Sequence, residues 1–185
     1  MTSRCVALVF ALGSATLACT GTDEREPEVP TDVEYCAEVV DWDAEWSDFE
    51  REVLERVNLY REAGATCGTT AFEPAPALVM NESLRCAARA HALDMATRDY
   101  VMHTSPEGTG FADRAEDAEY DAGPLAEALA AGLLTPEEVV VAWMGREAEC
   151  TYVMHPDANE FGIAYLETDE ATFGTYWVAV FGQRM

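Results

Sequence analysis

The chain has 185 residues and a formal net charge of −24, from 35 acidic residues against 11 basic ones. Every basic residue is an arginine, and the absence of lysine excludes Schiff-base chemistry and the lysine of a phosphate-binding P-loop. An acidic surface of this kind repels phosphate backbones and anionic lipid, so we expect no nucleic-acid partner. Cationic partners and divalent ions stay open, and the length suits one domain with a tail.

Residues 1–18 have the layout of a signal peptide. Arg4 is followed by an apolar run that ends at a small residue, and this run is too short to span a bilayer stably. The residues TLAC at 16–19 are similar to a bacterial lipobox, in which Cys19 would carry the lipid, although a lipobox usually has leucine where Thr16 stands. Two alternatives stay open, a lipoprotein anchored through Cys19 and a cleaved secreted protein. Both are extracytoplasmic, and membrane contact is expected only through the lipid anchor.

Residues 19–34 are expected to form an acidic, disordered tether. They include Pro27 and Pro30 and contain almost no apolar side chain, so the segment repels itself and has nothing to bury. The folded domain is therefore expected to occupy residues 35–185, and we expect it to be a monomer.

Two amphipathic helices are predicted in the first half of the domain. Ser47 and Glu50 have the spacing of a capping box, an apolar stripe follows, and Gly64 ends the first helix. The second helix starts near residue 81, where Asn81 or Ser83 can cap it. Its apolar face recurs at three- and four-residue steps and consists of Leu84, Ala87, Ala88, Ala92 and Met95.

A long polar stretch at 104–125 follows the second helix and contains a predicted short helix at 111–116. His103 lies directly before this stretch. Long loops inside a compact domain are usually functional or mobile, so His103 would mark the edge of a site. The alternative is that its imidazole only caps carbonyl groups at the helix end.

The last third of the chain changes its hydrophobic period. Thr135 and Glu138 predict a second capping box, with Pro136 at the first helical position. Residues 161–168 and 172–181 are rich in β-branched and aromatic side chains, which predicts an antiparallel hairpin turning at Asp169-Glu170. Helices first and a hairpin last indicate the α+β class, with helices packed on an antiparallel sheet.

Six motifs in a fixed order resemble the CAP superfamily of cysteine-rich secretory, antigen 5 and pathogenesis-related 1 proteins, in its bacterial secreted branch. They span about residues 48 to 182 and read NLYREAG, CAARAHALDMA, MHTS, LAEALAAG, VVVAWM and YWVAVFG. The resemblance implies an α-β-α sandwich with a small antiparallel sheet flanked by helices. It also implies a surface cleft with two histidines and two glutamates, which binds a divalent metal in some members.

The implied cleft is only half retained in this chain. The first histidine corresponds to His103, and one glutamate corresponds to Glu127 in LAEALAAG. The second histidine position falls on Glu149, and the second glutamate position falls on Arg146, a cation. A metal (Zn, Mg or Ca) would then have His103 and Glu127 as its ligands, a weak set that Arg146 would oppose by charge repulsion.

The two other histidines are weaker candidates. His155 follows the third helix and could replace the missing imidazole, whereas His91 is expected to be packed or hydrogen-bonded within the second helix. If His103 shares the cleft with carboxylates, their field should keep it protonated to higher pH.

Four cysteines, Cys36, Cys67, Cys86 and Cys150, suit two disulfides in an oxidising compartment, and none has the sequence context of a catalytic thiol. Four cysteines allow three pairings. Because the family fold places the first two helices near each other, we expect Cys67 to pair with Cys86, which leaves Cys36 with Cys150.

Three functions stay open at this stage. The first is a non-catalytic extracytoplasmic module that binds a lipid, a sterol or a peptide, and it rests on the resemblance, the disulfides and the degenerate cleft. The second is a divalent-metal-assisted hydrolase of peptidase type that uses His103 and Glu127, with Glu149 as a third carboxylate. The third is a purely structural role in the cell envelope. No cofactor is certain, and no Ser/His/Asp array or HExxH motif is present.

Overall fold

The computed structural model describes residues 28–185, so the expected signal peptide, Cys19 and most of the expected tether lie outside the described residues. No helix among the described residues is both long and apolar enough to cross a membrane. The elements in chain order are η1 (Glu34–Val39), α1 (Ala44–Ala63), β1 (Ala65–Cys67), β2 (Thr70–Phe72), β3 (Val79–Met80), α2 (Glu82–Arg98), α3 (Phe111–Asp117), β4 (Gly123–Ala131), α4 (Pro136–Met144), α5 (Glu147–Val153), β5 (Glu160–Glu167) and β6 (Thr175–Gln183).

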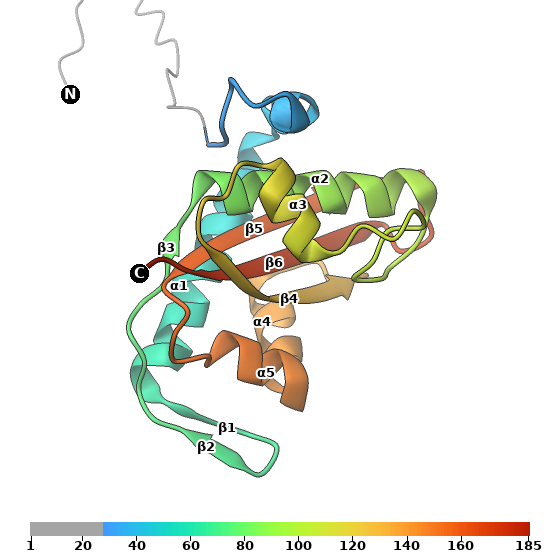
Figure 1. Cartoon of the computed structure of the whole chain (residues 1–185). Coiled ribbons are helices and arrows are strands. Elements are labelled where there is room, and N and C mark those ends of the chain that lie inside the picture. The colour runs from blue at the N-terminus through green and yellow to red at the C-terminus, as the bar shows by residue number, and fades with distance from the viewer. Residues whose placement is uncertain (1–27) are drawn as a thin grey trace, which may run out of the picture.

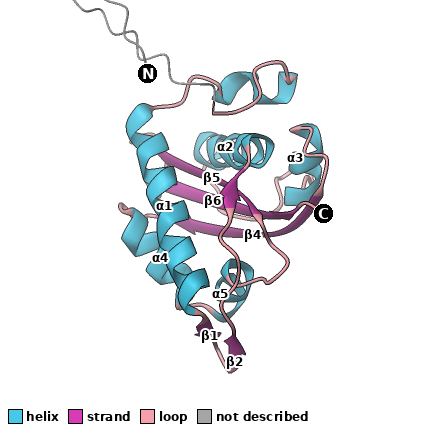
Figure 2. Ribbon diagram, turned by 90° about the vertical axis from the view of Figure 1, so that its left-hand side faces the viewer, coloured by secondary structure: helices cyan, strands magenta, loops and turns pink. Residues whose placement is uncertain are grey.

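The elements form three layers, helices on both faces of a central sheet (Figures 1 and 2). The sheet has the order β3-β5-β6-β4, in which β4, β5 and β6 are antiparallel and the two-residue β3 runs parallel to β5. One core holds α1, α4 and α5 against one face, and a second core holds α2 and α3 against the other. The predicted α-β-α sandwich of the α+β class is therefore confirmed. A separate hairpin, β1-β2, projects at one end.

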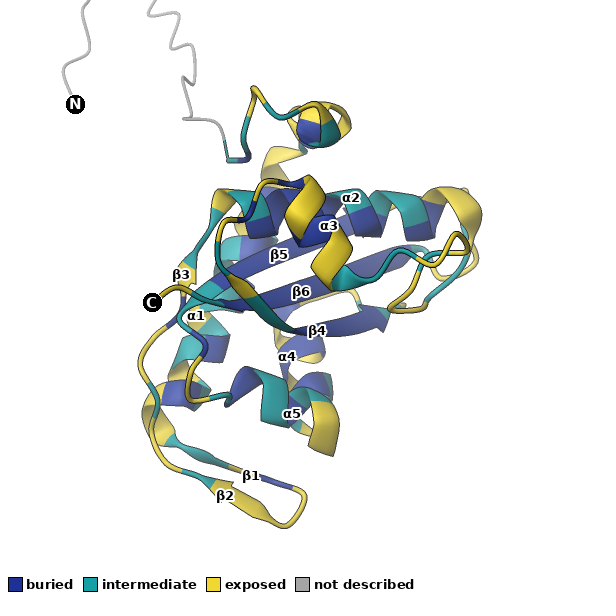
Figure 3. Ribbon diagram, in the orientation of Figure 1, coloured by how far each residue is buried: buried dark blue, intermediate teal, exposed yellow. Residues whose placement is uncertain are grey.

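The central strands β5 and β6 are apolar between their end residues because both of their faces are covered. In β5, Ile163 and Tyr165 belong to the core under α1, whereas Ala164 and Leu166 belong to the core under α2. Figure 3 shows this as continuous burial along β5 and β6. Gly162 allows α2 to lie directly on β5, since a Cβ at this position would come within 2.1 Å of the backbone of Leu84.

Local sequence signals account for the starts of α2 and α4. The Asn81 side chain accepts the N–H of Leu84 and caps α2, as predicted. The Thr135 and Glu138 capping box is present with Pro136 in the first turn of α4. The predicted hairpin is present as β5 and β6, but Glu167 is the last residue to pair, with Thr175, so its connection is longer than the predicted two-residue turn.

The first predicted capping box is wrong. Helix α1 starts at Ala44, and the carboxylate of Asp43 accepts the N–H of Glu45 as its cap. Ser47 and Glu50 therefore lie inside the helix, where both are buried. Glu50 instead accepts hydrogen bonds from two arginines of α2, at 2.8 Å from Arg85 Nε and 2.7 Å from Arg89 Nη2.

The folded part also begins earlier than predicted, because the expected tether is in contact with the domain from residue 28 onward. Val29 is 1 % exposed and packs in a small core with Cys36 and Val39. Glu28 forms salt bridges with Arg51 at 2.6 Å and Arg89 at 2.8 Å. The prediction of a disordered segment extending to residue 34 is therefore wrong for residues 28–34, which pack against the domain.

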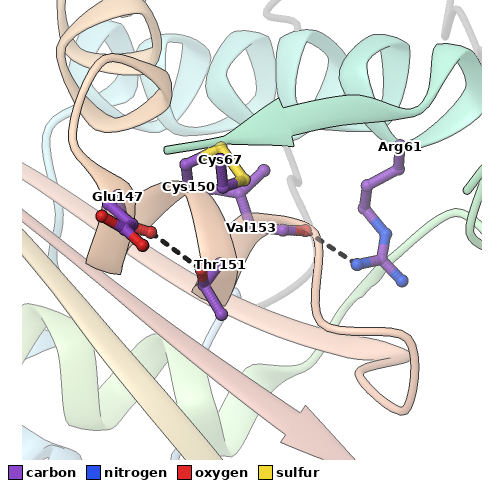
Figure 4. The surroundings of a disulfide bond; sticks show 6 residues. All are labelled: Arg61, Cys67, Glu147, Cys150, Thr151 and Val153. Carbon is purple, nitrogen blue, oxygen red and sulfur yellow. Dashed lines mark hydrogen bonds between the residues drawn. A yellow bond between two sulfur atoms is a disulfide. The ribbon is translucent and has the colours of Figure 1, made fainter. Parts of the chain in front are cut away.

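The predicted cysteine pairing is also wrong, because the disulfides join Cys36 to Cys86 and Cys67 to Cys150. Helix α1 meets α2 at its start, through Glu50, but its far end reaches the opposite side of the sheet. The strand that follows, β1, therefore lies beside α5 (Figure 1). Figure 4 shows the Cys67–Cys150 bond between these two elements, near the Arg61 guanidinium, which donates a hydrogen bond to the carbonyl of Val153 at 2.8 Å.

A first prediction concerns Glu28. Burial alone would raise its pKa, but hydrogen bonds from Ser47 and Arg89 and the charges of Arg85 and Arg89 outweigh burial and lower the pKa to about 2. The stabilisation is thus complete above the ordinary value of 4.5 and is lost as the pH falls toward 2. We expect Glu28→Gln to lower the unfolding free energy by about 2 kcal/mol at pH 7. The difference in unfolding free energy between the wild type and the variant should become smaller below pH 4.5.

Urea unfolding of both proteins at pH 7, 4 and 2.5 measures this difference in unfolding free energy. The matched control is Glu34→Gln, which removes a carboxylate from an exposed neighbouring position. Equal effects of the two substitutions at every pH would show that Glu28 affects stability only through the net charge of the protein and not through its salt bridges.

A second prediction concerns the disulfides. Non-reducing digestion and mass spectrometry of the oxidised protein should recover peptides linked Cys36–Cys86 and Cys67–Cys150. Replacing Cys67 and Cys150 together by serine should lower the unfolding free energy by about 2–4 kcal/mol, because a long closed loop in the unfolded chain is released. Recovery of a Cys67–Cys86 peptide would contradict the structure.

Candidate functional site

The loop that carries His103 is held by contacts at the end of α2. Asp99 adopts a left-handed conformation (φ 55°), and its N–H bonds to the carbonyl of Met95, which ends the helix. The imidazole of His91 then donates from Nε2 to the carbonyl of Met102 at 2.9 Å. His91 is thus a buried, hydrogen-bonded helix residue, as predicted, and it fixes the position of the residue next to His103.

Glu127 reaches the same place from strand β4. Its neighbours Ala126 and Ala128 face the core under α1, so the alternation of the strand directs Glu127 to the side of α2 and α3. Its Oε1 lies 2.9 Å from His103 Nδ1. The Glu127 side chain is 1 % exposed and the His103 side chain is 57 % exposed. The structure therefore brings the two predicted site residues together as a buried carboxylate that orients an exposed imidazole.

A third residue, Arg114 of α3, completes this group. Its Nη2 donates to Glu127 Oε2 at 2.7 Å and to the carbonyl of His103 at 2.9 Å, and its Nη1 donates to the carbonyl of Thr109 at 2.9 Å. Arg114 is 3 % exposed. It therefore fastens the loop to the sheet and occupies the second oxygen of Glu127.

The sequence analysis did not single out Arg114. The available signal was its setting, a lone arginine within the predicted short helix of a very acidic chain that has no lysine. Cations are few in such a chain, and arginine is the one suited to buried, multiply hydrogen-bonded positions.

The electrostatics around His103 follow the expectation for its imidazole. Its hydrogen bond to Glu127 raises the pKa of the imidazole, partial burial lowers it, and the charges of Glu127 and Glu149 raise it further. The net pKa lies above the ordinary value of 6.5. Because Nδ1 faces a carboxylate, it carries the proton in the neutral ring as well, which leaves Nε2 as the accepting atom.

The remaining predicted residues do not join this group by direct contacts. Glu149 lies in the first turn of α5 and accepts from Arg146 Nη1 at 3.3 Å, so the two substituted family positions pair with each other. His155 is at the turn after α5, where its Nδ1 accepts the N–H of Asp157. No hydrogen bond joins His155 to His103 or Glu127 among residues 28–185.

The donor set does not fit a divalent metal. Both oxygens of Glu127 already accept hydrogen bonds, and one of them lies 2.7 Å from a guanidinium nitrogen. A dication bound there would face the positive charge of Arg114 at close range. Within the described chain, no three His, Cys, Asp or Glu side chains are grouped so that they could hold a metal ion. The Glu127 part of the predicted metal site is therefore not supported.

Comparisons with known proteins agree with this architecture. The family model "CAP: Cysteine-rich secretory protein family" matches residues 54–181. A protein of Bacillus subtilis (strain 168), "Uncharacterized protein YkwD", is 30 % identical over 135 residues, which cover 73 % of this chain and 47 % of the relative. This chain thus spans about half the length of that relative.

Solved structures share the fold at low sequence identity. An outer surface protein from Borrelia burgdorferi superposes with a TM-score of 0.62 at 20 % identity, covering 75 % of this chain and 94 % of that one. An extracellular protein containing an SCP domain from Bacillus anthracis str. Ames gives a TM-score of 0.63 at 15 % identity, over 75 % of this chain and 41 % of that one. The family match covers more than half of the chain, so the protein belongs to the cysteine-rich secretory protein (CAP) family.

A third prediction concerns the His103–Glu127 pair. Because the pKa of His103 is raised on folding, the pair contributes stability that is complete below the unfolded value of 6.5 and is lost as the pH rises through the folded value. We expect His103→Gln to destabilise the protein more at pH 5.5 than at pH 8.5. The difference should stay below about 1 kcal/mol because the imidazole is more than half exposed.

Denaturant unfolding at both pH values measures this difference. The matched control is His155→Gln, which removes a histidine that makes no hydrogen bond to Glu127 in the described part of the chain. An independent readout is the NMR titration of the His103 ring, whose midpoint should fall in Glu127→Gln. An unchanged midpoint would contradict the pairing.

Proposed function

We propose that the protein is an exported, non-catalytic binding module whose ligand contacts are made around His103. The observation that carries this proposal is the pairing of the buried Glu127, whose two carboxylate oxygens accept one hydrogen bond each from His103 and Arg114. A carboxylate used in this way orients an imidazole and ties down a loop. Each of its oxygens already accepts a hydrogen bond from a cationic or protonated partner, and the side chain is 1 % exposed, which disfavours its use as a metal ligand or as an acid or base.

The surroundings of His103 support binding over turnover. Ser105, the hydroxyl two residues further along the loop, accepts the N–H of Thr109 at 3.2 Å and makes no hydrogen bond to His103 in the described structure. The four described cysteines are consumed in disulfides, which leaves no thiol nucleophile among residues 28–185. An activated nucleophile needs a base within hydrogen-bond reach, and none of these groups has one.

Among the three ligand classes, a peptide fits this surface better than a lipid or a sterol. The exposed imidazole stands at the start of a polar loop that offers hydroxyl, carboxylate and backbone groups. Such groups recognise a polar, hydrogen-bonding chain, whereas a sterol or an acyl chain needs a deep apolar cavity.

We propose an extracytoplasmic location, either anchored through Cys19 or secreted. It is supported by the signal-like residues 1–18, by the two disulfides and by the printed descriptions of relatives as outer surface or extracellular proteins. Cell fractionation of the wild type and of Cys19→Ala distinguishes the two forms, because loss of the lipid site should release an anchored protein from the membrane fraction.

A hydrolase that uses His103 without a metal is the second candidate. It is favoured by one observation. The buried carboxylate of Glu127 orients His103 through Nδ1, so Nε2 of the ring makes no hydrogen bond with Glu127. That arrangement suits a general base. If it worked in this way, the rate would rise with pH through the raised pKa of His103, since only the neutral ring accepts a proton.

The deciding experiment compares the mature wild-type protein with His103→Gln, and with His155→Gln as the matched control. Calorimetry with Zn²⁺, Mg²⁺ and Ca²⁺ and a multiple-turnover peptide hydrolysis assay are run on all three proteins. We expect no stoichiometric metal binding or turnover that depends on His103, while capture of a peptide from a defined peptide library is reduced about tenfold in His103→Gln alone. Turnover or metal binding that His103→Gln abolishes and His155→Gln retains would overturn the proposal.

A further inference from the structure

A concavity that is separate from the His103 group lies where the segment after η1 meets α2 and the end of β5. It has a volume of about 460 Å³, and its apolar walls include Trp42, Trp46, Leu93 and Leu166. Its size is within the range of small-molecule pockets. None of the residues of the His103 group lines it.

The two tryptophans are held in place by the fold. Their ring centroids are 5.3 Å apart with planes at 71°, so the indoles stand almost perpendicular to each other. The guanidinium of Arg89 lies 5.0 Å from the centroid of the Trp42 ring, and Arg89 is itself bound to the buried Glu50. Trp46 contacts Tyr165 edge-on, with 6.2 Å between centroids. The aromatic walls are therefore formed before any ligand arrives.

The rim of the pocket is negative. Four carboxylates line it, those of Glu38, Asp41, Glu167 and Glu170, and no basic residue does. None of the four forms a salt bridge in the part of the chain that the structure describes. The charge and the rings select the same kind of ligand, because a carboxylate attracts a cation through space and an indole face attracts one through its quadrupole.

We propose that this pocket binds a small organic cation of the quaternary-ammonium class. An anion is repelled by the rim, and a neutral apolar molecule gains nothing from the four carboxylates. A metal ion requires oxygen ligands gathered around one point, and residues 28–185 contain no such group of three. A methylated ammonium is weakly hydrated and carries an apolar surface, so it can pack against the indole rings while the rim carboxylates attract its charge.

Choline and its neutral carbon isostere, 3,3-dimethylbutan-1-ol, provide the probe and its control, because they differ in charge and hardly in shape. Titration of the mature protein is followed by calorimetry and by tryptophan fluorescence. We expect saturable binding of choline that is at least about tenfold tighter than that of the alcohol and that weakens with added salt. Equal binding of the two probes, or no choline binding, would overturn the proposal.

Variants of the rim locate the site. The double substitution Asp41→Asn with Glu170→Gln should weaken choline binding severalfold, whereas Glu52→Gln with Glu55→Gln, on α1 and outside the pocket, should leave it unchanged. Trp46→Phe retains an aromatic ring with a weaker cation interaction and should reduce the affinity with little change in the circular dichroism spectrum. If both double variants bind choline as tightly as the wild type, the bound cation is held elsewhere and the proposal fails.

Discussion

The architecture depends on one buried carboxylate, that of Glu50. It is fully buried, and it accepts hydrogen bonds from Arg85, Arg89 and the backbone N–H of Tyr165. These bonds join α1, α2 and β5 at a single point, although the two helices belong to different layers. A buried charge without a partner costs several kcal/mol, so the three elements are held in one mutual arrangement. Arg89 extends the network outward to Glu28 and to the ring of Trp42.

The group formed by His103, Glu127 and Arg114 uses the same chemistry. Arg114 and His103 share Glu127 in the way that Arg85 and Arg89 share Glu50. In both places a carboxylate is satisfied by cationic side chains of this chain. The charges of this site are thus paired within the protein, and this pairing is the basis of the proposal that His103 contacts a ligand.

Four of the described arginines are buried although cations are scarce in this chain. Arg61, Arg85, Arg89 and Arg114 are all buried, and Arg61 donates to backbone carbonyls, those of Pro76, Val153, His155 and Ala158. Arginine serves here because its planar guanidinium can donate several hydrogen bonds at once and is more weakly hydrated than an ammonium. These four arginines therefore join separate segments inside the molecule and add no positive charge to its surface, and the rim of the tryptophan pocket carries four carboxylates.

The sequence by itself determined the fold class, the starts of α2 and α4 and the presence of the C-terminal hairpin. These follow from hydrophobic period and from caps such as Asn81 and Thr135, which act within a few residues and leave a local pattern. The pairing of His103 with Glu127 was reached only through the family resemblance.

The tertiary structure alone decided the features that join distant segments. Ser47 and Glu50 have the spacing of a capping box, but the burial of α1 against α2 turns Glu50 into an interlayer ion partner. The cysteine pairs depend on where α1 ends in space, which is on the side of the sheet away from Cys86. The role of Arg114 depends on the packing of α3 beside β4, which brings its guanidinium to Glu127. Such contacts join residues that lie tens of positions apart in the sequence. They are set by the packing of the layers, so a local hydrophobic period or residue spacing does not predict them.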